Sequence, residues 1–117
     1  MLGGQEIICQ DCKKCNIQAL VEVSKVIEKP DYKTVSNFIC SLDSSCRNNI
    51  EFSEWSNSLI FDIINSDVNL FNQVIHDLGY DYVLLVAKEL EYPTKEQDLK
   101  KIYNLVIESI GPKDLIL

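Results

Sequence analysis

The stretch from Ser53 to Gly79 constrains the fold more than any other part of the chain. Its apolar residues form two groups, and within each group they recur at steps of three and four, the spacing of one helical face. Asn65, Ser66 and Asp67 separate the groups, and such side chains favour turns and helix N-caps. The sequence therefore predicts two short helices joined by a tight turn, with the remaining helices packed against this pair. The two groups are Trp55, Leu59, Ile60, Ile63 and Ile64, and then Val68, Phe71, Val74, Ile75 and Leu78.

Two helices are predicted before this stretch. Apolar residues at helical spacing favour a helix over residues 9–29, which Pro30 ends because the residue before a proline is pushed out of the helical region. Asp31 is a candidate N-cap for a second helix with its buried face in residues 32–42. Ser53 is the candidate N-cap of the third helix.

Two more helices are predicted after it. Gly79 supplies the left-handed residue that commonly closes a helix, here the fourth. Asp81 then offers a cap for a fifth helix over residues 82–90, whose sequence is apolar nearly all round and is therefore expected to be the most buried. A strand is the alternative for its apolar run. Thr94–Gln97 fits a capping box for a sixth helix that Gly111 and the following proline stop.

The length and composition fit one folded domain. The chain has 117 residues, of which 46 % are hydrophobic and 25 % charged, values typical of a globular domain with its own core. We expect an all-α fold, a compact bundle of five to six short helices joined by tight polar turns. The expected divisions are residues 1–8 as a flexible N-terminal segment or expression remnant, 9–112 as the helical domain and 113–117 as an apolar tail.

The net charge of −7 restricts the classes of partner. An acidic surface repels phosphate backbones, so nucleic-acid binding is disfavoured. It suits a protein partner with a basic surface. No apolar run approaches the length of a membrane span, and the N-terminus lacks the pattern of a secretory signal. A cytoplasmic location is the default expectation, and an extracytoplasmic one follows if the cysteines are bridged.

The N-terminal cysteines carry the main chemical signal. Cys9, Cys12 and Cys15 form C-x-x-C-x-x-C, and Cys40 and Cys46 follow later. Three thiolates at this spacing, with Cys40 or Cys46 as a fourth ligand, suit a zinc ion or an iron–sulfur cluster. The candidate metal site is therefore Cys9, Cys12, Cys15 and Cys40.

Disulfides are the alternative state of the same residues. Five cysteines allow two bridges and one odd thiol in an oxidising compartment. Cys40 and Cys46 flank an expected turn between helices, so they pair either with each other or with the N-terminal group. In a reducing compartment all five remain free, partly buried thiols.

No catalytic constellation is evident. His76 is the only histidine, and no serine or cysteine stands near it in a nucleophile motif. With four glycines in the chain, a phosphate-cradling loop is not expected. Trp55 and the tyrosines at positions 80, 82, 92 and 103 suit core or boundary positions. We therefore expect a protein that is not an enzyme.

The stretch from Ile8 to Leu78 resembles a saposin-type domain. Cys9 and Cys12 match the C-x-x-C of that family's first helix, Cys40 matches a cysteine near the end of its second helix, and Cys46 is nearest to one that begins the third. The apolar pattern from Trp55 to Ile64 is also similar. The family's last two cysteines, which bridge back to the first two, are absent, because those positions fall near Asn72 and Leu78. The resemblance implies lipid or membrane interaction in a secreted or lysosomal setting.

These observations lead to three functional hypotheses. The leading one is a non-enzymatic acidic helical module that binds another protein, as an adaptor or as an inhibitor or immunity-type protein acting on a basic surface. The alternatives are a saposin-like lipid-binding domain and a small zinc or iron–sulfur protein.

Overall fold

The computed structural model describes residues 13–110, with the side chain of Ile110 left out, and all regular elements in this range are helical. The expected segments 1–8 and 113–117 lie outside the described residues. The elements are α1 (Ile17–Lys25), α2 (Tyr32–Cys40), the short 3-10 helix η2 (Ser44–Asn48), α3 (Ile50–Leu78), α4 (Tyr80–Glu91) and α5 (Leu99–Ile110). The all-α prediction is confirmed.

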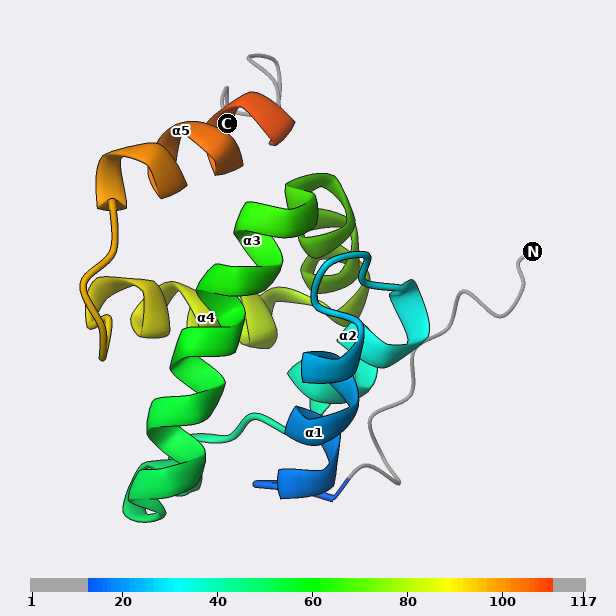
Figure 1. The fold of residues 1–117 in the computed structure, drawn as a ribbon, viewed down its shortest axis with the longest axis vertical. Helices are drawn as coiled ribbons and strands as arrows, with labels where there is room; N and C mark the ends of the chain where they lie inside the picture. Colours follow the sequence, from blue (N-terminus) through cyan, green and yellow to red (C-terminus); the bar gives the residue numbers. More distant parts are fainter. Residues whose placement is uncertain (1–12, 111–117) are drawn as a thin grey trace.

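The long helix α3 organises the molecule. It contacts α1, α2, η2, α4 and α5, as Figure 1 shows. Its helical geometry breaks at Asp67, whose φ of −157° and ψ of 82° are extended. The Asp67 carboxylate accepts a hydrogen bond from the backbone N–H of Leu70 and so caps the second half of the helix. The structure confirms the predicted pair of helices and the break between them at Asp67. It also confirms that the other helices pack against this pair.

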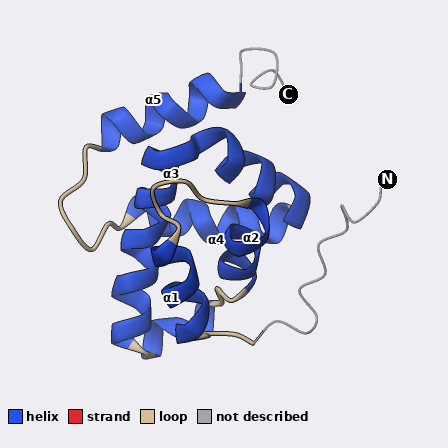
Figure 2. Cartoon of the chain, turned by 45° about the vertical axis from the view of Figure 1, so that its right-hand side comes forward, coloured by secondary structure: helices blue, strands red, loops and turns tan. Residues whose placement is uncertain are grey.

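The core lies between α3 and the helices around it. Four phenylalanines at positions 38, 52, 61 and 71 are almost fully buried, one from α2 and three from α3. Isoleucines and valines at helical spacing fill the space between them. Figure 2 shows the helical layers, with loops confined to the ends of helices.

The predicted first helix is wrong at both ends. The helix begins at Ile17, because Cys15 has a positive φ of 54° and Asn16 is the N-cap, whose side chain accepts from the N–H of Gln18. It ends at Lys25, several residues before the proline, because Val26 leaves the helical region and its N–H turns to the carbonyl of Val23. Residues 9–12 of the predicted helix lie outside the described range.

Three other predicted starts are also wrong. Asp81 does not cap α4, because that helix begins at Tyr80 and Asp81 lies in its first turn. Asn49, and not Ser53, caps α3, because its side-chain oxygen accepts from the N–H of Phe52. Thr94 does not cap α5; Asp98 does so, accepting from the N–H of Lys101. Asp31 is the N-cap of α2 as predicted, and its carboxylate accepts hydrogen bonds from the N–H and the hydroxyl of Thr34.

The helix expected to be most buried is among the more exposed. Residues 80–91 do form a helix, so the strand alternative is wrong, but Val86 is the one residue of α4 that is buried. Tyr80 is 72 % and Leu84 50 % exposed. The helix packs on α3 along one face, so Tyr82, Leu85 and Leu90 are only partly buried and Tyr80, Val83 and Leu84 stay exposed. An apolar helix surface without a partner is a candidate for binding.

None of the described helices is both long enough and apolar enough to cross a membrane.

Candidate functional site

The cysteines nearest the core form disulfides. Cys15 and Cys46 are joined, with their Cα atoms 5.4 Å apart, so the bridge ties the start of α1 to η2. Cys40 is also disulfide-bonded. The sequence left two pairings open for Cys46, one with Cys40 and one with the N-terminal group. The structure has the second of these, through Cys15.

The four-cysteine metal site stays a prediction. Cys9 and Cys12 lie outside the described residues, while Cys15 and Cys40 are bridged, and a bridged sulfur is no thiolate ligand. Within residues 13–110, no group of three or more histidine, cysteine or acidic side chains is placed to hold a metal ion. A metal site at these cysteines would need the reduced chain.

The other residues singled out in the sequence do not come together. His76 lies on the surface of α3 with its side chain 90 % exposed, near the Asp77 carboxylate. Trp55 packs half-buried against the core. Tyr82 accepts a hydrogen bond from Lys14. The saposin-like positions Cys40 and Cys46 lie at the end of α2 and in η2, and the lipid binding that the resemblance implies stays a prediction.

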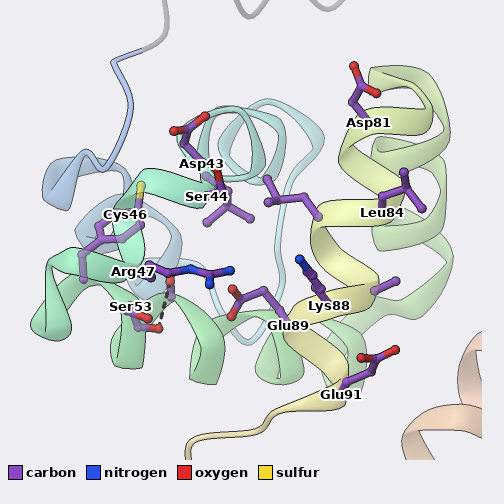
Figure 3. Close-up of a pocket in the computed structure, with 15 residues that line it drawn as sticks. Asp43, Ser44, Cys46, Arg47, Ser53, Asp81, Leu84, Lys88, Glu89 and Glu91 are labelled. Atoms are coloured by element: carbon purple, nitrogen blue, oxygen red, sulfur yellow. Dashed lines mark hydrogen bonds between the residues drawn. The ribbon is translucent and has the colours of Figure 1, made fainter.

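A groove between η2 and α4 is a candidate site (Figure 3). Its volume is about 520 Å³, and one wall comes from the end of α2, η2 and the start of α3, the other from α4. Its floor is apolar, with Leu42, Phe52 and Leu85 among the lining residues. A concave apolar surface with a few polar groups around it is the usual form of a ligand site.

Charged side chains surround this floor. Figure 3 shows Asp43 and Arg47 on one wall and Asp81 and Lys88 on the other. The carboxylates outnumber the cations, with Asp43, Asp81, Glu89 and Glu91 against Arg47 and Lys88. The groove thus combines an apolar floor with a mainly acidic rim.

Local hydrogen bonds hold the Asp43 carboxylate in place. It accepts from both the hydroxyl and the backbone N–H of Ser45 at the start of η2. These bonds lower the pKa of Asp43 below its ordinary value, and the charge of Lys14 adds to the effect. Asp43 therefore stays ionised in mildly acidic solution.

Asn57 of α3 fixes the end of the α4 wall. Its side-chain amide donates to the Glu89 carboxylate, to the Glu89 carbonyl and to the carbonyl of Tyr92. Its oxygen accepts from the N–H and hydroxyl of Thr94. This one buried amide satisfies groups at the end of a helix that lack partners within the helix.

A second hollow of about 650 Å³ lies among the second half of α3, α4 and α5. Its lining is mainly uncharged, with asparagine, glutamine and serine side chains beside Ile75 and Val83. The Asn72 Nδ2 atom at this hollow is buried and has no hydrogen-bond partner. Among the described residues that line this hollow, the exposed His76 is the one with a titratable side chain.

Apart from Cys46, which was a candidate metal ligand or disulfide partner, none of the groove residues was predicted as a site residue from the sequence. One signal was present, since Asp81, Leu84, Leu85 and Lys88 recur at helical spacing and so share one face of α4. The opposite wall had no comparable signal, because η2 is a five-residue helix in a stretch expected to be a turn.

Comparisons with protein-family models, with curated proteins and with solved structures find no match for this chain.

Proposed function

We propose that this chain is a non-enzymatic protein-binding module that holds a short segment of a partner protein in the groove between η2 and α4. The observation that carries the proposal is the groove itself, which has an apolar floor and a rim of four carboxylates and two cations. Burial of apolar side chains supplies affinity, and the rim selects partners by charge. An adaptor and an inhibitor acting on a basic surface both fit this description.

The net charge supports a basic partner. With a formal charge of −7, the chain attracts a basic surface from beyond contact distance and accelerates encounter. Such attraction weakens with added salt, because the Debye length shortens to about 8 Å at physiological ionic strength.

The disulfides favour an oxidising compartment for this function. A bridge between Cys15 and Cys46, with a second at Cys40, persists outside reducing cellular compartments. We therefore place the module and its partner outside the cytoplasm.

The test is selection of short displayed peptides against the full oxidised chain at low salt. We expect groove binders that carry apolar and basic residues and that Leu85→Ala weakens about tenfold or more. Leu90→Ala is the matched control, because Leu90 is also a half-buried leucine of α4 but does not line the groove. Binders equally affected by both substitutions, or an absence of binders, would overturn the proposal.

A further inference from the structure

Lys14 joins the two walls of the groove at one end. Its side-chain amine donates to the carbonyl oxygen of Cys40, 2.8 Å away at the end of α2, and to the hydroxyl of Tyr82 on α4, 2.9 Å away. It lines a hollow of about 290 Å³ together with Asp43 and Asp81, which also line the groove. Because α4 packs mainly on α3, this amine links it to the wall that it faces across the groove.

The residue after Lys14 has a strained backbone. Cys15 has a φ of 54°, in the left-handed region that residues with a Cβ rarely adopt. Two contacts hold it there, the disulfide to Cys46 and a hydrogen bond of 2.8 Å from its N–H to the Ser41 carbonyl. The cost of this conformation is comparable to the net free energy of one or two hydrogen bonds. The covalent bridge is therefore the contact that decides whether the conformation persists.

The strained torsion also determines where the Lys14 amine lies. The φ angle describes rotation about the N–Cα bond of Cys15, with Lys14 on one side of this bond and α1 on the other. The values that a residue with a side chain prefers, about −60° to −160°, differ from 54° by more than about 100°. Relaxation of Cys15 would therefore turn Lys14 away from Tyr82 while α1 stays packed in the core.

We infer that the disulfide between Cys15 and Cys46 is a redox-sensitive switch of the groove. The intact bridge keeps Lys14 between the walls, and reduction releases Lys14 and lets α4 separate from η2. The inference goes beyond the proposed function, because it concerns the separation of the walls and not what the groove binds.

The reductant is a dithiol. Cys15 is partly exposed and Cys46 is 4 % exposed, so a thiolate of the dithiol attacks the Cys15 sulfur, and Cys46 leaves as a thiolate that takes up a proton. The second thiol of the reductant then displaces the Cys15 thiolate, which is protonated in turn. The reductant becomes a cyclic disulfide, and two electrons and two protons have passed to the bridge.

The first experiment removes the Lys14 contacts while the bridge stays intact. Lys14→Met keeps an unbranched stem without the amine, and we expect amides in the first half of α4 to exchange with deuterium about threefold faster, the effect of partly exposed hydrogen bonds. Lys33→Met is the matched control, because Lys33 is an exposed lysine of α2 that lines neither the groove nor the smaller hollow. It should leave α4 unchanged. Mass spectrometry of the full oxidised chain follows the exchange.

The second experiment removes the bridge in two ways. Cys15→Ser with Cys46→Ser leaves a side chain at the strained position, whereas Cys15→Gly with Cys46→Ser leaves a residue that adopts a positive φ without penalty. We expect the serine pair to raise exchange in the first half of α4 about threefold, as Lys14→Met does, and the glycine pair to raise it much less. Both pairs lose the same covalent link, so the difference between them reports the Cys15 torsion.

Two further measurements complete the test. Adding Lys14→Met to the serine pair should give no further increase in α4 exchange, because the amine is already released. Treatment of the wild-type chain with dithiothreitol should raise α4 exchange in step with the alkylation of Cys15.

Three results would overturn the inference. Equal increases from the serine and glycine pairs would mean that the bridge does not act through the Cys15 backbone. Unchanged α4 exchange in Lys14→Met would mean that the amine does not hold the walls together, and this result does not depend on whether the serine pair folds. Additive effects of Lys14→Met and the serine pair would mean that the two act independently. Since none of these results concerns binding of a partner segment, the proposed function would stand.

Discussion

The amide nitrogen of Asn57 lies 2.9 Å from the Glu89 carboxylate oxygen and 3.0 Å from the Glu89 carbonyl oxygen. This contact joins the buried face of α3 to the last turn of α4, across 32 positions of sequence. The end of the α4 wall is therefore placed by one side chain of the central helix.

Replacing this side chain is expected to be costly. Asn57→Ala leaves carbonyl groups at the end of α4 without a partner, so the free energy of unfolding should fall by about 2–3 kcal/mol. Urea denaturation followed by circular dichroism measures the change. Asn104→Ala, at an exposed position of α5, is the control and should cost nothing. A loss below about 0.5 kcal/mol for Asn57→Ala would contradict the assigned role.

The bridge between Cys15 and Cys46 should contribute strongly to stability. The two residues are 31 positions apart, and the chain-entropy relation gives about 3–4 kcal/mol for a loop of this length. The double variant Cys15→Ser with Cys46→Ser should lose this amount in denaturant unfolding. Alkylation of the native chain without reductant should leave both cysteines unlabelled, and labelling of either one would refute the pairing.

Tyr32 links α2 to the end of α3 and gives a pH-dependent contribution. Burial, and then the hydrogen bond to Asp77 and its charge, raise the pKa of Tyr32 to about 12 from the ordinary 10.0. Because the folded value is the higher one, the contribution is complete below pH 10 and is lost as the pH rises toward 12.

The substitution Tyr32→Phe tests this link directly. It removes the hydroxyl that donates to Asp77 and should lower the free energy of unfolding by about 1 kcal/mol at neutral pH. The difference from the wild type should shrink in alkaline solution. Tyr103→Phe, at an exposed position, serves as the control. An equal effect of the two substitutions would argue against the Asp77 contact.

Gly79 forms the junction between α3 and α4. Its φ of 111° and ψ of 174° lie where side chains are strained, although no atom lies within 4 Å of an added Cβ. Gly79→Ala should therefore cost about 1–3 kcal/mol through the backbone alone. D-alanine at the same position, introduced by chemical synthesis, adopts this conformation readily and should restore stability. Thermal unfolding of the proteins with glycine, L-alanine and D-alanine at position 79 measures these differences in stability.

The sequence was sufficient to predict the helices that carry their own signals. The apolar spacing on both sides of Asp67 predicted the central pair, and Asp31 and Gly79 marked ends that the structure confirms. Local sequence signals gave wrong helix starts where tertiary contacts determine the position of the cap. Thr94 fits the sequence pattern of a helix N-cap, but its backbone N–H donates a hydrogen bond to the side chain of Asn57, 37 positions away.

The sequence could not predict the partial burial of α4 or the presence of the groove, because both depend on tertiary contacts. An apolar run predicts burial only if other elements cover every side of it, and α4 is packed on α3 along one face. The groove needs the opposite wall, and the disulfide fixes η2 there through a pairing that spacing left open. Neither fact is encoded within one local segment.

The two walls of the groove differ in how they are attached. The wall at η2 is bonded covalently through Cys46 to the start of α1, while α4 is held by packing and by Asn57. Local opening therefore has a lower free-energy cost in α4 than in η2. In hydrogen exchange, the amides of α4 should exchange first in the free protein and slow down when a peptide occupies the groove. Under the proposed function, a partner would therefore adjust the groove through α4 more readily than through η2.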